Sequence, residues 1–142
     1  MKTRRILSLI IVSLLVAALL GSATASASVV RSSPTLSSYG AVLTKGSNTG
    51  KFVITYDVSA NNIAESLGVS YMKIYKSGGD YVTTIYATNL NGFKASGTMS
   101  HRNSYTYTGT SGTSYYAEVT VFATIDGVTD SRTVTTNTVK AP

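Results

Sequence analysis

The sequence predicts an all-β protein, an antiparallel sandwich or small barrel of seven or eight short strands. Residues 51–60 alternate strictly between apolar and polar side chains, which is typical of a half-buried strand. Turn-forming residues interrupt similar runs about every 8–12 residues along the chain. The composition also suits strands, because tyrosine and threonine are abundant and the chain has only 2 prolines.

The alternating runs and the turns between them place the individual elements. Hairpin turns are expected at Ser77-Gly78-Gly79-Asp80 and at Asp126-Gly127, because these residues suit tight turns. Residues 61–66 are expected to form one helical turn. The expected strands, in chain order, are residues 39–44, 51–60, 69–76, 81–86, 97–101, 104–108, 115–123 and 131–139.

The first 27 residues have the pattern of a cleavable signal peptide. Three basic residues within the first five positions precede an apolar run, 6–20, which at about 15 residues is too short to span a bilayer. Small residues follow, and they fit cleavage after Ala25 or after Ala27. An uncleaved anchor is the alternative. We expect a secreted protein whose signal peptide engages the secretion machinery and whose mature chain does not span the membrane.

The mature chain is expected to be one domain, with a flexible lead-in at 28–38 and the sandwich at 39–142. Counted from residue 28, nine basic and six acidic residues remain, a net charge of +3. The basic residues are scattered singly, so nucleic acid is not an expected partner. The chain has no cysteine, which excludes disulfides, a lipid-modified N-terminal cysteine and a thiol nucleophile.

The region from Gly112 to Ala123, with Asp126-Gly127 and residues 131–134 after it, resembles the last hairpin of fibronectin type III and other immunoglobulin-like domains. Such domains often have a tyrosine at the entrance of this strand, and its hydroxyl bonds back to the preceding corner. Tyr115 has the right parity with the two valines that follow it for that role. The resemblance implies an antiparallel immunoglobulin-like β-sandwich.

Over the whole mature chain the pattern is similar to small secreted proteins of Gram-positive bacteria that have no assigned activity. The shared features are Leu67-Gly68-Val69, the following Met72 and Ile74, and the run from Gly112 through Tyr115 to Phe122-Ala123. This resemblance implies export and a β-sandwich, and it implies no catalytic residue.

The sequence has no arrangement of side chains that is typical of an enzyme. His101 is the single histidine, so any Ser-His-Asp arrangement would need it. It stands in the polar stretch 99–103, where we expect a solvent-exposed side chain in a connecting segment. The six acidic residues fall mostly in turns or at solvent-facing strand positions. We therefore expect no enzyme and name no catalytic residue.

No metal or cofactor is expected either. Zinc and similar metals need cysteine or clustered histidine, which the sequence lacks. Residues 126–130 offer two carboxylates, as a calcium loop would, but the same pattern is typical of a plain β-turn. The chain has no glycine-rich loop of the kind that binds phosphate.

An exposed aromatic surface is the best candidate for a functional site. If Met72 and Ile74 point inward, strand alternation turns Tyr71, Lys73 and Tyr75 outward. In the strand 115–123 the outward residues are then Tyr116, Glu118, Thr120 and Phe122. An immunoglobulin-like sandwich places these strands in one sheet. The predicted binding face consists of Tyr71, Lys73, Tyr75, Tyr116 and Phe122, residue types that suit recognition.

Two alternatives stay open for this surface. Aromatic pairs stabilise an exposed sheet by about 0.2–1 kcal/mol each without any partner. Alternatively Val69, Tyr71 and Tyr75 form the core face, and Met72 and Ile74 the outer one. We expect a non-catalytic binding or interaction module for an unknown protein or glycan at the cell exterior. The other candidates are a secreted structural or assembly subunit that pairs through an exposed edge strand, and a bacteriocin-like toxin.

Overall fold

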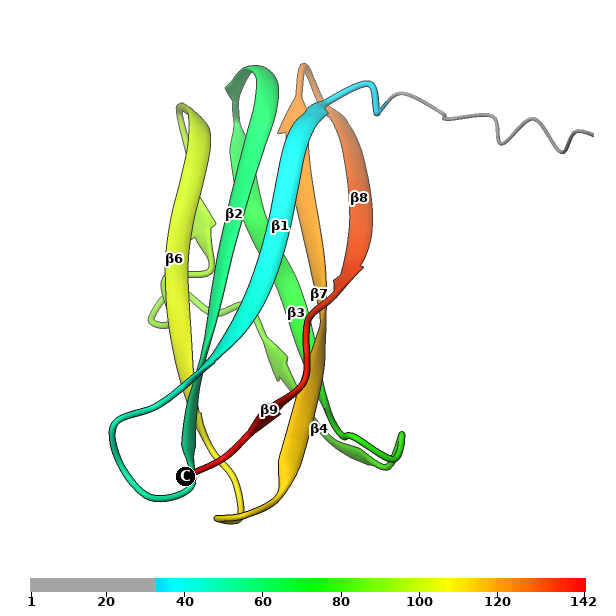
Figure 1. Ribbon diagram of the computed structural model, residues 1–142. Coiled ribbons are helices and arrows are strands. Elements are labelled where there is room, and N and C mark those ends of the chain that lie inside the picture. The colour runs from blue at the N-terminus through cyan, green and yellow to red at the C-terminus, as the bar shows by residue number, and fades with distance from the viewer. Residues whose placement is uncertain (1–32) are drawn as a thin grey trace, which may run out of the picture. The chain divides into compact units, whose positions relative to one another are not determined.

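The computed structural model describes residues 33–142, and this part of the chain is all-β with antiparallel sheets (Figure 1). The predicted signal peptide, 1–27, and the first residues of the predicted lead-in, 28–32, lie outside the described residues. Within 33–142 the chain forms no helix, so none there is long and apolar enough to cross a membrane. The described residues form one compact unit with a single hydrophobic core cluster, so we expect this unit to fold by itself.

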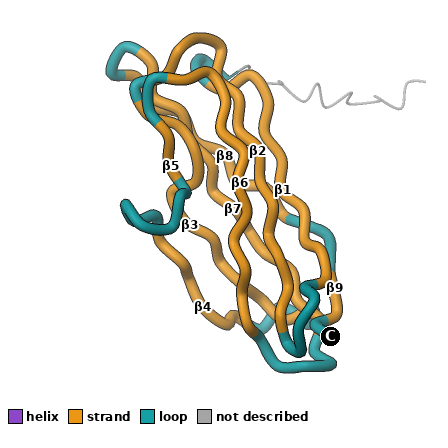
Figure 2. Tube along the Cα trace, turned by 90° about the vertical axis from the view of Figure 1, so that its left-hand side faces the viewer, coloured by secondary structure: helices purple, strands orange, loops and turns teal. Residues whose placement is uncertain are grey.

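Within residues 33–142, nine strands make up two sheets that pack as the layers of a sandwich (Figures 1 and 2). One sheet has the order β1-β2-β6. The other has the order β4-β3-β7-β8, and the short strands β5 and β9 pair with β3 and β7. The strands are β1 (Leu36–Lys45), β2 (Lys51–Ala64), β3 (Ser66–Lys76), β4 (Tyr81–Tyr86), β5 (Lys94–Ala95), β6 (Thr98–Thr108), β7 (Ser114–Ile125), β8 (Val128–Thr135) and β9 (Val139–Lys140).

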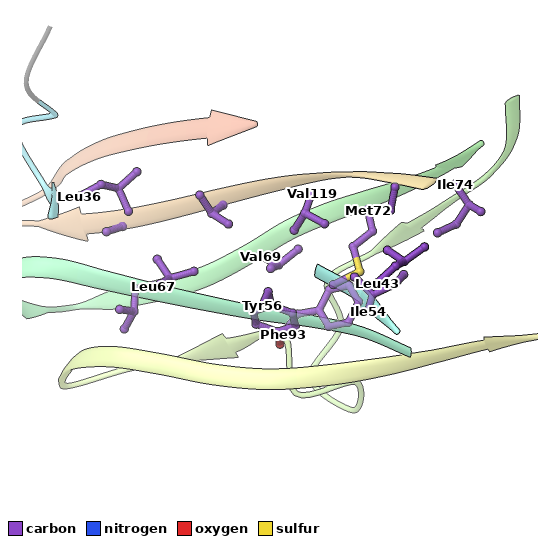
Figure 3. Close-up of a cluster of buried hydrophobic side chains, with 14 of the residues drawn as sticks. Leu36, Leu43, Ile54, Tyr56, Leu67, Val69, Met72, Ile74, Phe93 and Val119 are labelled. Carbon is purple, nitrogen blue, oxygen red and sulfur yellow. The ribbon is translucent and has the colours of Figure 1, made fainter. Parts of the chain in front are cut away.

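The strand 51–60 and the strand 115–123 have the predicted alternation. The inward residues of β2 and β7 meet between the two sheets, where they are fully or almost fully buried (Figure 3). These buried side chains include Phe52, Ile54, Tyr56, Val58, Tyr115, Val119 and Val121. Because no disulfide is possible, this apolar layer holds the two sheets together.

The predicted helical turn at 61–66 is wrong. These residues continue β2 and begin β3, because Ala64 is buried and pairs with Thr98, and Leu67 is fully buried just after it. The backbone N–H of Asn61 donates to the carbonyl of Thr35 at 2.8 Å, so this end of β2 is also attached to the segment before β1.

The boundary of the predicted lead-in also differs. Strand β1 begins at Leu36, three residues before the expected start, and Leu36 is buried. Thr35 is buried as well, and its hydroxyl donates to the carbonyl of Ala123 at 3.0 Å.

Two later strand predictions also differ from the structure. The strands expected at 97–101 and 104–108 are one strand, β6. The last expected strand, 131–139, is instead β8 followed by the short β9.

Strand β3 contains a β-bulge that decides which of its faces is buried. Val69 lies opposite Val121 and Tyr71 lies opposite Thr120, so Ser70 is an extra residue in β3. The extra residue reverses the parity of the strand. As a result Val69 before the bulge and Met72 after it both point into the core, where both are fully buried (Figure 3).

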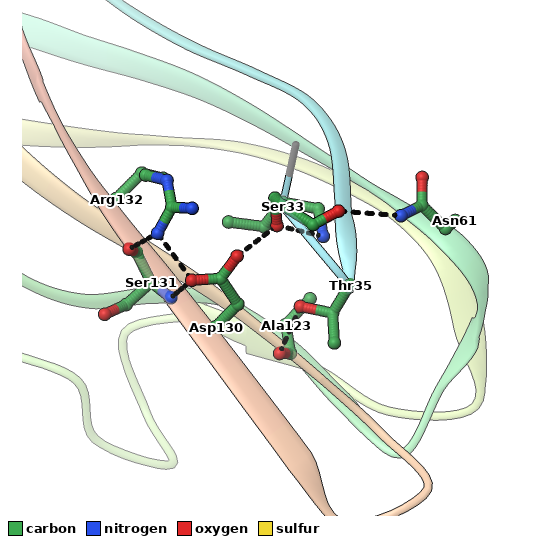
Figure 4. A network of polar contacts seen from close by, with 8 residues as sticks. Ser33, Thr35, Asn61, Ala123, Asp130, Ser131 and Arg132 are labelled. Carbon is green, nitrogen blue, oxygen red and sulfur yellow. Dashed lines mark hydrogen bonds and ion pairs between the residues drawn. The ribbon is translucent and has the colours of Figure 1, made fainter. Parts of the chain in front are cut away.

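The segment before β1 is held by a small polar network around Asp130 (Figure 4). The hydroxyl of Ser33 donates to one carboxylate oxygen of Asp130, and Arg132 donates to the other at 2.5 Å. The backbone N–H of Ser131 donates to the same carboxylate at 2.9 Å. These donors, above all Ser33, hold the pKa of Asp130 below its ordinary value.

Asp130→Asn is expected to lower the melting temperature at pH 7 but not in acid. A carboxyl whose pKa is depressed by folding stabilises the protein above its unfolded pKa, and this contribution is lost as the pH falls through the folded pKa. Thermal melting at pH 7 and in strong acid, well below the ordinary pKa of an aspartate, measures the effect, which we expect to be about 0.5–1.5 kcal/mol at neutral pH. Asp126→Asn, in the exposed β7–β8 turn, is the control. If the melting temperatures of wild type and Asp130→Asn still differed in strong acid, the stabilisation could not come from the ionised carboxylate of Asp130.

Candidate functional site

The five residues predicted to form a binding face lie on one side of the β4-β3-β7-β8 sheet. Cross-strand neighbours in an antiparallel pair point to the same face. Tyr75 lies opposite Tyr116, Lys73 opposite Glu118, and Phe122 opposite Gly68. Met72 and Ile74 between them are fully buried, so the outer face carries Tyr71, Lys73, Tyr75, Tyr116 and Phe122, each of them half-buried.

Two further tyrosines join this face from β4. Tyr81 lies opposite Tyr75, and Tyr86 lies opposite Tyr71. They are also the most exposed of the group, at 59% and 66%. We call the set Tyr71, Tyr75, Tyr81, Tyr86, Tyr116 and Phe122 the aromatic face. The sequence signal for the two added residues was the hairpin turn at 77–80, which forces β4 into the same sheet as β3.

The rings of the aromatic face contact one another across the strands. Tyr75 is stacked on Tyr116, with ring centroids 5.1 Å apart and planes at 11°. On its other side Tyr75 meets Tyr81 edge-on, at 5.8 Å. Tyr71 and Tyr86 form a second pair at 6.1 Å. The tyrosine rings therefore form two rows across the sheet, with Lys73 and Glu118 between them, and Phe122 lies beyond these rows, opposite Gly68.

Two side chains of opposite charge, Lys73 and Glu118, lie opposite each other beside these rings. The Nζ of Lys73 lies 5.7 Å from the ring centroid of Tyr71, within the range of a cation–π contact. The hydroxyl of Tyr75 donates to Glu118 at 3.2 Å. Burial and the neighbouring Glu118 raise the pKa of Tyr75 above its ordinary value. The surface thus offers broad apolar area, hydroxyl groups and little net charge.

A polar cleft borders the aromatic face beyond Phe122. Its volume is about 300 Å³. Lys94 of β5 lies opposite Gly68, whose neighbour on the other side is Phe122, so cleft and face share this row of the sheet. The loop between β4 and β5 projects from the sheet (Figure 2), and Thr88, Asn89 and Gly92 of this loop line the cleft. The lining of the cleft is polar and includes no acidic side chain; it consists of Ser66, Thr88, Asn89, Gly92, Lys94 and Ser96.

The expectation of an exposed His101 in a connecting segment is wrong. His101 lies on strand β6, opposite Val58, and its ring packs against Tyr56 with centroids 5.8 Å apart. Its Nε2 lies 2.8 Å from the carbonyl oxygen of Gly92, which also accepts from the Tyr56 hydroxyl at 2.9 Å. Burial raises the pKa of Tyr56 to about 12. His101 therefore anchors the loop before β5 to the core, a structural role.

The stretch 126–130 forms a tight turn and the start of β8. Asp126 and Gly127 have φ of 49° and 73°, as a two-residue hairpin turn requires, and the N–H of Gly127 donates to Glu65. Asp130 is engaged by Ser33 and Arg132. Within residues 33–142, no three or more His, Asp or Glu side chains gather in a way that could hold a metal ion.

Tyr115 closes the end of the sandwich at the start of β7. Its hydroxyl accepts a hydrogen bond from the backbone N–H of Thr110 at 2.9 Å, and its ring stacks on Phe52 at 5.0 Å. Burial raises the pKa of Tyr115, but the hydrogen bonds with Thr110 and Thr113 and the charge of Lys76 lower it, so the pKa lies below its ordinary value. A Cβ at Gly109 would lie 2.8 Å from the Tyr115 ring, which explains a glycine there.

Comparisons of the chain with protein-family models, with curated proteins and with solved structures found no match. The functional conclusion therefore depends on the geometry of the aromatic face and on the sequence.

Proposed function

We propose that the protein is a secreted, non-catalytic binding module that recognises a protein or glycan at the cell exterior through its aromatic face. The observation that carries the proposal is the gathering of six aromatic side chains on one side of one sheet. Aromatic side chains, tyrosine above all, are enriched at recognition surfaces because they offer large contact area with few rotatable bonds.

The exposure of Tyr81 and Tyr86 favours recognition over a purely structural role. Cross-strand packing explains Tyr75 and Tyr116, whose rings cover each other. It does not explain why the edge strand has large aromatic side chains that are more than half exposed. A polar β-former such as threonine would suit an edge strand equally well and would avoid an exposed apolar surface.

The proposal includes an immunoglobulin-like fold. In such sandwiches the third strand shares a sheet with the last two, and a fourth strand joins that sheet in variable-type domains. The order β4-β3-β7-β8 agrees with this arrangement. Further support comes from Tyr115, whose hydroxyl bonds back to Thr110 as the tyrosine of the corner does in that family.

Export is proposed from the signal-peptide pattern at 1–27, and the absence of catalysis from the distribution of reactive side chains. His101 is engaged with the carbonyl of Gly92, and Asp130 with Ser33 and Arg132. Neither lies on the aromatic face.

The double variant Tyr81→Ser/Tyr86→Ser is expected to lose binding and keep its fold. The mature chain, residues 28–142, is tested against intact cells of the producing organism and against a panel of insoluble polysaccharides. Because exposed aromatic anchors carry much of the energy of an interface, we expect affinity to fall roughly tenfold or more. The melting temperature should change little.

The matched control is Tyr39→Ser/Val42→Ser, which also replaces two exposed apolar side chains but on β1 of the other sheet. It should bind as wild type does. Equal binding by all three proteins, equal loss in the control, or no binding by wild type to any probe would overturn the proposal.

A further inference from the structure

In the described part of the chain, four strands of six or more residues lie at the edges of the two sheets: β1, β6, β4 and β8; the two-residue strands β5 and β9 also lie at edges. An edge strand presents N–H and C=O groups to solvent, and these can pair with another strand unless something occupies or shields them. A side chain shields an edge strand when it forms hydrogen bonds with the backbone N–H or C=O groups of that strand. The hydrogen bonds show which edge strands have such a side chain.

On three of these four strands, side chains bind both backbone groups of one residue within the strand. On β1 the side chain of Asn137 binds both the N–H and the C=O of Leu43, at 2.9 and 3.0 Å. On β6 the hydroxyl of Thr98 binds the C=O and N–H of Ser100, at 3.1 and 3.4 Å. On β8 the side chains of Asp130 and Arg132 bind the N–H and C=O of Ser131, at 2.9 and 2.8 Å.

Strand β4 differs from the other three. Its sequence, Tyr81-Val82-Thr83-Thr84-Ile85-Tyr86, has no charged residue and no proline, the two residue kinds that commonly block an edge. Within residues 33–142 no side chain binds the backbone of Val82–Ile85; Asn91 binds the carbonyl of Tyr86 at the end of the strand. We propose that β4 is a pairing edge at which two copies of this chain join by antiparallel strand addition.

A second copy fits this edge because β4 is compatible with itself. A two-fold axis at Thr84 places Thr84 opposite its own copy and Thr83 opposite Ile85, so no like charges meet. It also brings the exposed Tyr86 of one copy toward the exposed Tyr81 of the other. The same operation on β8 would bring two strands together that carry Asp130 and Arg132, whose side chains already occupy that backbone.

The pairing has a consequence for the aromatic face. Two copies joined at β4 form one continuous sheet, in which the two aromatic faces lie side by side. A bulge at the start of β4 leaves Val82 unopposed, because Ile74 faces Thr83 and Tyr75 faces Tyr81. The regular part of the edge is therefore short, and the dimer should be reversible and depend on protein concentration.

Sedimentation velocity on residues 28–142, over about two decades of concentration, tests the pairing. We expect the mass of the wild type to rise from monomer toward dimer. Thr84→Lys places two lysines opposite each other and should weaken association by about tenfold. Thr133→Lys on β8 is the matched control, because each change removes one hydroxyl contact, Tyr81–Thr84 or Thr120–Thr133; it should associate as wild type does.

A mixture of Thr84→Lys and Thr84→Glu tests the register. Each variant alone should be monomeric, and the mixture should form a heterodimer because opposite charges then meet at the two-fold axis. A wild type that stays monomeric, a Thr84→Lys that associates normally, a Thr133→Lys that weakens association equally, or a mixture without heterodimer overturns the inference.

If the charged variants do not fold, hydrogen exchange on the wild type tests the pairing at β4 instead. Protection of the amides of Thr83–Ile85 should increase with protein concentration, and unchanged protection overturns the pairing. Ligand binding by the aromatic face is measured on the monomer at low concentration, so this inference and the proposed function can fail separately.

Discussion

Gly68→Ala is expected to lower the free energy of unfolding by about 3 kcal/mol or more. Gly68 has a φ of 140°, which side-chain-bearing residues rarely adopt. A Cβ there would lie 2.0 Å from the carbonyl oxygen of Phe93, so the backbone of the neighbouring segment would have to move. That carbonyl accepts from the N–H of Val69 at 2.8 Å, and the fully buried Phe93 ring packs against Tyr56 at 5.9 Å.

Urea unfolding of residues 28–142 measures this effect. Gly78→Ala is the control, because a Cβ at Gly78, in the β3–β4 turn, meets nothing within 4 Å. The control should change stability by less than about 1 kcal/mol, since it mainly restricts the unfolded chain. If Gly68→Ala were as stable as Gly78→Ala, the tight contact between β3 and the segment at Phe93 would be contradicted.

The all-β fold was predictable because burial in a sandwich follows strand alternation. From Phe52 to Val58 in β2, buried apolar residues alternate with more exposed ones without interruption. The chain has enough such apolar residues to fill the layer between the two sheets. The turns at 77–80 and 126–127 were equally visible, because glycine beside aspartate suits the positive φ that tight hairpins require. Both turns join the strands that they were predicted to join.

The bulge in β3 could not be predicted from the same rule. Val69, Met72 and Ile74 all point inward although their spacing breaks the period of two, so either face of this strand remained possible. An extra residue at Ser70 is decided by pairing with β7, and the local sequence carries no signal for it. The helical turn predicted at 61–66 failed for a similar reason, because pairing of Ala64 with Thr98 overrides local preference.

The candidate site was predictable in part. Tyr71, Lys73, Tyr75, Tyr116 and Phe122 lie on one outer face, as alternation in two neighbouring strands requires. Tyr81 and Tyr86 were missed, because a hairpin turn alone does not determine which residues of β4 lie opposite those of β3, and a bulge shifts this register. The shielding of three sheet edges, which singles out β4, depends on contacts between residues as far apart as Leu43 and Asn137.

Phe52→Ala is expected to destabilise the domain by about 3–5 kcal/mol, the range for a buried phenylalanine. Phe52 is fully buried and connects the two sheets, because it belongs to β2 and stacks on Tyr115 of β7. Tyr107 of β6 contacts the same ring at 5.4 Å. The substitution leaves a cavity between these aromatic rings and removes the support of Tyr115, whose hydroxyl holds Thr110.

The neighbouring residue supplies the sharpest control, because a strand sends successive side chains to opposite faces. Val53→Ala, on the outer face of β2, should cost less than about 1 kcal/mol in the same urea unfolding experiment. A large loss at Phe52 beside a small one at Val53 is what a two-layered sandwich requires. Equal losses would mean that both faces of β2 are buried alike, and the outward direction inferred by the same logic for the tyrosines of β3 and β7 would then lack its physical basis.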